Sequence, residues 1–314
     1  MGLLFLFYKS ILSIVEYILF AFLALLASAG NTIFNRLGAN HASALTNATI
    51  KSFFIVIACF IISAIFGHVP TLYTLALEQW LWILLIGALT SIDWFFYFLA
   101  IKKSHLEAFA PFCAAGILFF SNLLFSIFIF SSVTNGGKPL NIALYFLGLA
   151  SLLGSLIFIV FNKKINPKTK LLWVAFALLS VVSFSFVLLI VKLKLTSVPS
   201  DVISYHQILF VFIAMLVASL FTKSIKEITK IRWIDHLYIF LGAVCNAVMM
   251  VTRYTALSYE NAVPAIVTVI VGLDFILVSI GTVLFFKAKN KLQLVTIIVL
   301  VATGMVLNVL AGLL

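Results

Sequence analysis

The sequence predicts an all-α membrane protein with ten transmembrane helices, built as two inverted-topology five-helix repeats. Three observations lead to this prediction. Of the 314 residues, 64% are hydrophobic and 9% are charged, whereas a soluble domain is about half apolar and about a quarter charged. Apolar runs recur along the whole chain, and one helical span takes roughly 20 apolar residues. The two halves also carry glycines and aromatic residues at a constant separation.

The same composition excludes several other classes of protein. A mean hydropathy of +1.26 excludes a disordered chain and a secreted disulfide scaffold. A membrane β-barrel needs alternating polar and apolar residues, and residues 171–191 are apolar without alternation. The cysteines Cys59, Cys113 and Cys245 lie singly in apolar runs, without metal-binding spacing. We therefore expect no metal, no cofactor and no soluble catalytic domain.

Apolar runs bounded by charged or turn-forming residues predict the ten spans in order. They are residues 14–35, 43–66, 80–100, 106–130, 140–161, 171–191, 203–221, 236–257, 261–286 and 292–313. Polar, helix-breaking joints at residues 136–139 and 166–168 are expected outside the bilayer. The first run also resembles a signal peptide, because residues 27–29 are small enough for cleavage. Glu16 inside that run, and a matching span in the second half, favour an uncleaved helix.

The net charge of +11 is explained by basic residues in the loops, which set the orientation of a membrane protein. Fifteen basic residues fall at one face: Arg36, Lys51, Lys102, Lys103, Lys163, Lys164, Lys168, Lys170, Lys223, Lys226, Lys230, Arg232, Lys287, Lys289 and Lys291. Five fall at the other face, with both termini: Lys9, Lys138, Lys192, Lys194 and Arg253. Since cytoplasmic loops are enriched in Lys and Arg, both termini are expected on the non-cytoplasmic side. The basic excess thus calls for no nucleic acid.

An internal repeat relates the two halves of the chain. Ala100 and Ala256 are 156 residues apart, and the same separation relates three further pairs. These pairs are Gly116 with Gly272, Phe119 with Phe275 and Gly148 with Gly304. Because five spans are an odd number, the second copy crosses the membrane in the opposite sense, as in transporters that work by alternating access. We predict one repeat at residues 1–161, a basic cytoplasmic linker at 162–170 and the second repeat at 171–314.

Prolines occupy corresponding places near the starts of the fourth and ninth spans, at Pro111 and Pro264. Proline in a helix interior removes a backbone hydrogen bond and bends the chain. Paired helix breaks indicate the binding site of a carrier. Proline is also common in membrane helices without a function, so both interpretations stay open.

These features resemble a known family. The passage from Gly87 to Phe130, with Ala100 to Ser104 leading into the fourth span, and its partner from Gly242 to Phe286 look like two EamA-type units of the drug/metabolite transporter superfamily. Gly148 and Gly304 match the glycines in the last span of each unit. The resemblance implies a ten-helix secondary carrier with a central cavity lined mainly by spans one, three, four, six, eight and nine.

One departure from the family pattern limits this analogy. Many such units end span four or nine with a glycine–glutamate pair. Here residues 128–131 read Phe-Ile-Phe-Ser and residues 285–287 read Phe-Phe-Lys. No role of that glutamate can be carried over to this chain.

Asp274 and Asp93 are the main candidates for charge handling, because an ionisable group near the bilayer centre is costly unless it has a function or a partner. Asp274 lies near the middle of the ninth span. It can take up a coupling proton, hold a cationic group, or serve only as a structural hydrogen-bond acceptor. A helical wheel places Thr268 and Gly272 on a different face, so both faces should not reach one narrow cavity.

Asp93 lies beside Trp94 and one turn before Tyr97, so a carboxylate and aromatic rings can meet a substrate together. A structural role is the alternative. Lys51 can neutralise Asp93 or bind an anion. We expect it instead to extend to the nearby cytoplasmic interface, as long basic side chains near helix ends do.

Arg253 and several amides are further substrate-binding candidates. Arg253, with Asn246 two turns back on the same face, can grip a carboxylate or phosphate or pair with Glu260. Asn31 and Asn122 are buried amides that contact a substrate or, as we favour, join helices. His206, near an outer helix end, is either a pH-sensitive gate or solvated.

The leading hypothesis is a secondary transporter, not an enzyme, that moves a small polar or amphipathic metabolite across a bacterial cytoplasmic membrane. The substrate is amino-acid-like or nucleoside-like, and a proton or substrate gradient supplies the energy. A lipid-acting membrane enzyme that uses Asp93, Asp274 and His206 is a second hypothesis, and a structural membrane partner without turnover is a third. The sequence does not indicate the oligomeric state.

Overall fold

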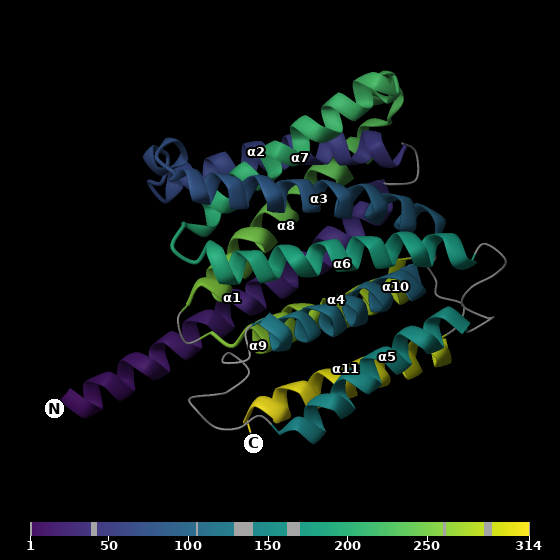
Figure 1. Ribbon diagram of the computed structural model, residues 1–314. Helices are drawn as coiled ribbons and strands as arrows, with labels where there is room; N and C mark the ends of the chain where they lie inside the picture. The colour runs from purple at the N-terminus through teal and green to yellow at the C-terminus, as the bar shows by residue number, and fades with distance from the viewer. Residues whose placement is uncertain are drawn as a thin grey trace.

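The chain folds into a bundle of long helices (Figure 1). The computed structural model describes residues 2–38, 43–104, 106–128, 141–161, 170–259, 262–285 and 291–313. The helices are α1 Gly2–Gly38, α2 Ala44–Ile65, α3 Leu77–Lys103, α4 Leu106–Phe128, α5 Ile142–Phe161, α6 Lys170–Lys194, α7 Ser200–Phe221, α8 Trp233–Ser258, α9 Pro264–Gly272, α10 Asp274–Phe285 and α11 Lys291–Leu313. The described ranges also contain the short 3₁₀ helices η1 Pro70–Tyr73 and η3 Ser224–Lys230.

The ten predicted spans are confirmed. Within the described residues, ten helical segments are long and apolar enough to cross a membrane. The all-α prediction is confirmed as well, since no strand occurs in the described part of the chain. Large apolar side chains remain exposed along the outer helix faces, such as Phe22 at 51% and Phe146 at 62%. This exposure suits a lipid environment, in which an apolar outer surface is not penalised.

Four pairs of helices make the most extensive contacts in the described part of the chain. The main contacts are α1 with α8, α3 with α6, α5 with α11 and α2 with α7, and Figure 1 shows α2 and α7 on one side of the bundle and α5 and α11 on the other. If α1 corresponds to α6 and α3 to α8, then the α1–α8 contact is the counterpart of the α6–α3 contact. The α2–α7 and α5–α11 pairs then each join corresponding helices.

Helix boundaries follow the separation of 156 residues that relates the two halves of the sequence. The first residues of α2 and α7, Ala44 and Ser200, are 156 apart, as are Leu77 and Trp233, which begin α3 and α8. The last residues of α1 and α6, Gly38 and Lys194, have the same separation. Three pairs of helix boundaries thus share the separation found in the sequence, and the division of the chain into two repeats stays a prediction.

Two glycines that the repeat predicts to be equivalent meet at one helix crossing. A Cβ on Gly148 of α5 would lie 3.0 Å from the carbonyl oxygen of Gly304, and a Cβ on Gly304 of α11 would lie 3.0 Å from that of Gly148. Small residues let membrane helices approach this closely. Asn308 fills the remaining space and donates a hydrogen bond of 2.7 Å to the Gly304 carbonyl.

The ninth span departs from the prediction of one continuous helix over residues 261–286. It consists of α9 and α10, which are separated at Leu273. The Leu273 backbone N–H contacts the carbonyl oxygens of both Val269 and Ile270, and Ile276 N–H bonds to the Leu273 carbonyl at 3.0 Å. These three-residue spacings tighten the helix locally. Pro264 lies at the start of α9, where its missing N–H costs no hydrogen bond, so it does not cause this break.

Candidate functional site

A cavity of about 120 Å³ lies within the helix bundle. Its lining residues come from α1, α2, α3, α4, α6, α7, α8, α9 and α10. Among the residues that the structure describes, α5 and α11, which lie at one side of the bundle (Figure 1), contribute none of the lining. The resemblance implied a lining from spans one, three, four, six, eight and nine, and the structure adds Lys51 of α2 and Gln207 of α7.

Most of the predicted site residues line this cavity. They are Asn31, Asp93, Trp94, Tyr97, Asn246, Arg253 and Asp274. Asn122 does not: it is buried farther along α4, and its side-chain amide has no hydrogen-bond partner within the described residues. Its backbone carbonyl instead accepts a 2.7 Å hydrogen bond from the Tyr145 hydroxyl. The structure therefore gives Asn122 no place in the candidate site.

The two aspartates are each held by a serine from another helix. Ser180 of α6 donates a hydrogen bond to Asp93 Oδ1, and Ser28 of α1 donates one to Asp274 Oδ2. Both carboxyl groups lie in the cavity wall. A serine hydroxyl stabilises a carboxylate by one hydrogen bond but does not neutralise its charge.

The break at Leu273 corrects the expectation from the helical wheel. Asp274 lines the cavity together with Thr268 and Gly272, although a continuous helix would place them on different faces. The tightened turn changes the angular relation between α9 and α10, because Asp274 begins a new helix. Both faces therefore reach one cavity.

Arg253 is a buried cation in the same wall, with 7% of its surface exposed. Its guanidinium carbon lies 5.2 Å from the centre of the Phe184 ring, which fits a cation–π contact. Within the described part of the chain its Nε atom has no hydrogen-bond partner. Glu260, the alternative partner for Arg253, lies outside the described residues.

Lys51 also lies in the cavity wall and does not extend to the interface as expected. It is 2% exposed, and its ammonium group donates hydrogen bonds of 2.5 Å to Asn31 Oδ1 and 2.7 Å to Asn35 Oδ1. The same nitrogen lies 5.1 Å from the Trp94 ring centre and 5.7 Å from that of Phe98. Two amide oxygens and two ring faces compensate part of the loss of hydration, which explains why the side chain remains inside.

The four charged groups of the cavity are not paired with one another. They are Lys51, Asp93, Arg253 and Asp274. Among the described residues, no ion pair within 4.0 Å joins any two of them. Each makes its short contacts with neutral hydroxyls, amides or aromatic rings, while Lys51 and Asp93, and Arg253 and Asp274, attract each other electrostatically from beyond 4.0 Å. The cavity thus offers two cationic and two anionic side chains to a ligand.

Gln207 joins three helices at the cavity wall. Its amide nitrogen donates to Thr90 Oγ1 at 2.5 Å, and its amide oxygen accepts from the Tyr254 hydroxyl at 2.9 Å. Gln207 is 156 residues from Lys51, and Tyr254 is 156 residues from Phe98. The repeat thus relates the Lys51–Phe98 contact to the Gln207–Tyr254 contact, with different chemistry in each half.

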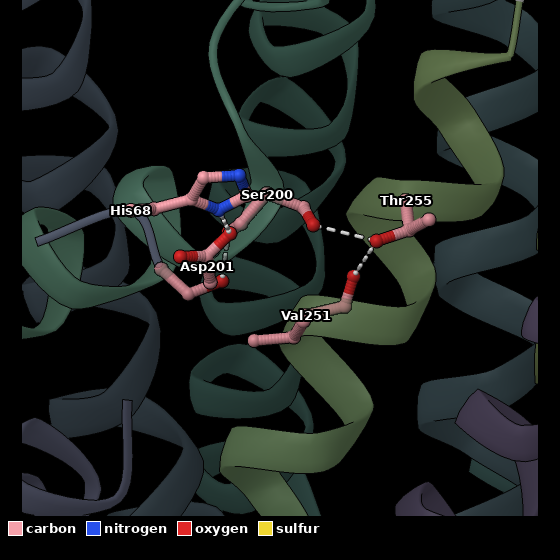
Figure 2. Close-up of polar contacts among 6 residues, drawn as sticks. His68, Ser200, Asp201, Val251 and Thr255 are labelled. Atoms are coloured by element: carbon pink, nitrogen blue, oxygen red, sulfur yellow. Dashed lines mark hydrogen bonds and ion pairs between the residues drawn. The ribbon is translucent and has the colours of Figure 1, made fainter. Parts of the chain in front are cut away.

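Polar contacts also join the helix ends near the start of α7 (Figure 2). His68 Nδ1 lies 2.9 Å from Asp201 Oδ1, and the hydroxyls of Ser200 and Thr255 are 2.5 Å apart. Thr255 in turn donates a 2.8 Å hydrogen bond to the Val251 carbonyl. The Ser200–Thr255 contact joins α7 to the segment of α8 that carries Arg253.

His206 is buried close to this region, which contradicts the expectation of a solvated histidine. It is 4% exposed, its Nε2 atom lies 3.0 Å from the Leu72 carbonyl oxygen, and its ring centre lies 4.5 Å from that of Trp80. His206 is not among the residues that line the cavity. It therefore does not share one wall with Asp93 and Asp274, as the enzyme hypothesis requires.

Ser28, Asn35, Ser180 and Gln207 are site residues that the sequence reasoning missed. A signal for two of them was present, because Ser28, Asn31 and Asn35 follow helical spacing on one face of α1. Ser180 and Gln207 carry no such pattern. Their place in the site depends on how α6 and α7 pack against α3.

Within the described residues, ten apolar spans around a cavity with four charged side chains define a multi-pass membrane protein. A model of the EamA-like transporter family matches residues 171–310. This match confirms the resemblance to EamA-type proteins of the drug/metabolite transporter superfamily and, with the ten spans, supports a membrane transporter rather than an enzyme.

A solved structure supports the fold. That protein, described only as "Crystal structure of protein", is 15% identical to this chain, with a TM-score of 0.63 over 95% of this chain and 98% of its own. No curated protein sequence matches this chain. At 15% identity the similarity describes the fold and says nothing about the substrate.

Proposed function

We propose that the chain is a secondary transporter for a small metabolite that carries both a positive and a negative group, such as an amino-acid-like zwitterion. Transport occurs by alternating access between the two five-helix repeats, across a cytoplasmic membrane with both termini on the outer side. The observation that carries the proposal is the set of four charged side chains in one cavity, none of which forms an ion pair within 4.0 Å among the described residues.

Charges in a membrane interior are costly when they form no direct ion pair, because attraction from beyond 4.0 Å compensates only part of their lost hydration. A zwitterion supplies both signs of charge and so compensates both kinds of side chain. An uncharged nucleoside-like molecule would stack on the aromatic lining but would form no direct ion pair with any of the four charges. The amino-acid-like alternative is therefore favoured.

Arg253 is best placed to bind the anionic group of the substrate. Its Nε has no hydrogen-bond partner within the described residues, and its guanidinium group lies over the face of the Phe184 ring. The planar fork of N–H groups then remains available to a carboxylate, which it can bind with two parallel hydrogen bonds. Asp93 and Asp274 handle the compensating positive charge, whether it belongs to the substrate, to Lys51 or to a coupled proton.

A thermal-unfolding screen of the detergent-purified protein against amino acids, nucleosides, organic cations and sugar phosphates tests this proposal, because a ligand of the native state raises its apparent stability. We expect a reproducible shift from zwitterions, followed by saturable uptake of the same compound into proteoliposomes. Stabilisation by uncharged nucleosides alone, or by sugar phosphates alone, would contradict the proposed substrate class.

Arg253→Lys sharpens the test. The variant keeps the positive charge but loses the planar fork, so the substrate affinity should fall about tenfold or more. Arg232→Lys is the matched control, because Arg232 is exposed and pairs with Asp235 outside the cavity. Equal affinity in the two variants would remove Arg253 from the binding site.

A further inference from the structure

The surroundings of Lys51 have the chemistry of a binding site for an organic ammonium ion. Two amide oxygens, from Asn31 and Asn35, accept its N–H groups at 2.5 and 2.7 Å. The ring faces of Trp94 and Phe98 lie 5.1 and 5.7 Å away. Hydrogen-bond acceptors together with aromatic faces are the groups by which proteins recognise ammonium ligands. We call these four residues the ammonium cage.

The ammonium cage is part of the cavity. All four of its residues, and Lys51 itself, line the cavity wall. The amides are also held in place: Asn35 Nδ2 lies 3.2 Å from Asn31 Oδ1 and 3.4 Å from the Tyr97 hydroxyl. With the N–H groups of Asn35 engaged there, the amide oxygens are directed at the cation. The acceptors are thus positioned for an ammonium group, whatever molecule carries it.

Lys51, whose ammonium group occupies the cage, has a flexible side chain. Lysine carries its charge on four methylene groups with several rotatable bonds, so its ammonium group can move while its backbone stays fixed. Asp93 directly precedes Trp94 in the chain and lies in the same cavity wall. It is a carboxylate that can receive the lysine ammonium once that group leaves the cage.

We propose that the ammonium cage of Asn31, Asn35, Trp94 and Phe98 is the subsite for the ammonium group of the substrate, and that Lys51 occupies it in the empty protein. Lys51 is then an internal competitor. When a substrate ammonium enters the cage, Lys51 moves to Asp93, and both positive charges gain partners. This inference rests on the proposed function, because it assigns one half of the zwitterion to a place in the cavity.

Removal of the lysine tests the ammonium cage directly. In Lys51→Ala the cage is empty, and n-butylammonium should raise the apparent unfolding temperature saturably, by about 2 °C or more. Tetramethylammonium, which has no N–H to donate to the amides, should raise it less. The wild type should not respond at the same concentrations, because its own lysine fills the cage. Lys51→Met should not respond either, because its side chain still fills the space.

Two controls separate the cage from general effects of amines. Lys192→Ala removes a lysine that also donates to two carbonyl oxygens, those of Leu257 and Tyr259 at 3.0 and 3.3 Å, but not in the cavity. It should show no rescue by n-butylammonium. Adding Asn35→Leu to Lys51→Ala should abolish the rescue, because one acceptor is lost.

The outcomes decide between the possibilities. A Lys51→Ala protein that unfolds cooperatively without a saturable response to n-butylammonium overturns the cage, and so does an equal response of the wild type. If Lys51→Ala yields no folded protein, purification in n-butylammonium should restore a monodisperse product, and failure to do so also overturns it. If n-butylammonium binds but the protein transports no substrate, the proposed function is refuted and the ammonium cage is retained. If the protein transports a substrate but n-butylammonium does not bind, only the ammonium cage is refuted.

Discussion

Glu227 illustrates how single polar contacts fix a helix end outside the spans. Its Oε2 atom accepts hydrogen bonds from the Ser43 backbone N–H at 3.1 Å and from the Thr46 hydroxyl at 2.9 Å. These two residues form the start of α2, where Ser43 is also the N-cap residue. The hydrogen bonds favour the ionised carboxylate and lower the pKa of Glu227 below its ordinary value.

This shift predicts a pH dependence of stability. A carboxyl group whose pKa is lower in the folded state stabilises the fold above its unfolded pKa, and the stabilisation is lost as the pH falls through the folded pKa. Thermal unfolding of the wild type and of Glu227→Gln should therefore differ at neutral pH, by less than about 1 kcal/mol because the group is partly exposed. The difference should vanish in acid. A difference that grows on acidification would show that Glu227 acts in another way.

Individual residues differ in how far the sequence predicts their role. Asp93, Asp274 and Arg253 could be selected because charge inside a membrane is rare and costly, and the structure places all three in one cavity. The expectation for Lys51 was wrong, because its distance from the helix end allows both an interfacial and an inward orientation. Only the positions of Asn31 and Asn35 on a neighbouring helix decide between them.

At the scale of helices, the crossing of α5 and α11 depends on the absence of side chains. Gly148→Ala should lower the unfolding temperature in detergent, because the new Cβ would lie 2.5 Å from Asn308 Nδ2 and 3.0 Å from the Gly304 carbonyl oxygen. Overpacking of this kind costs about 1 to 3 kcal/mol. Gly154→Ala, on the same helix, is the matched control, since a Cβ added at Gly154 would have no atom within 4 Å among the described residues. Equal stability of the two variants would mean that the crossing can separate without cost.

Helix existence was predictable, whereas helix continuity was not. Apolar runs of about 20 residues locate every span, because the bilayer sets the length of a helix. The break at Leu273 has no such signal, because Gly272 and Leu273 are compatible with a continuous helix and Pro264 lies nine residues earlier. Both α9 and α10 pack against α1 and α4, so the break lies within a region of tertiary contacts that the sequence of one span does not reveal. The helical wheel of the ninth span failed for this reason.

For the whole molecule, alternating access predicts that the cavity wall is reached by water. Two native cysteines test this, because Cys113 lines the cavity whereas Cys59 is fully buried elsewhere. In single-cysteine variants, a small water-soluble thiol reagent should label Cys113 and leave Cys59 unmodified, and a bound substrate should slow the labelling. If both cysteines resist the reagent in the native membrane, the chain is better described as a structural partner without turnover.

The architecture was the most predictable level of the molecule. Composition, the spacing of the apolar runs and the 156-residue separation predict the ten-helix design, and the boundaries of α2, α3, α7 and α8 follow that separation. The location of the cavity follows only from packing, since nine of the helices contribute to it and no single one defines it.

The charges of Lys51, Asp93, Arg253 and Asp274 sum to zero when all four are ionised. Moving one elementary charge through a membrane potential of 100 mV changes the free energy by about 2.3 kcal/mol. If the empty cavity carried a net charge, the conformational change that turns it from one side of the membrane to the other would therefore depend on the voltage. A cavity with zero net charge does not have this voltage dependence. The net charge moved in each transport cycle then equals the charge of the transported molecules. It is zero for a zwitterion alone and one elementary charge when a proton crosses with the zwitterion.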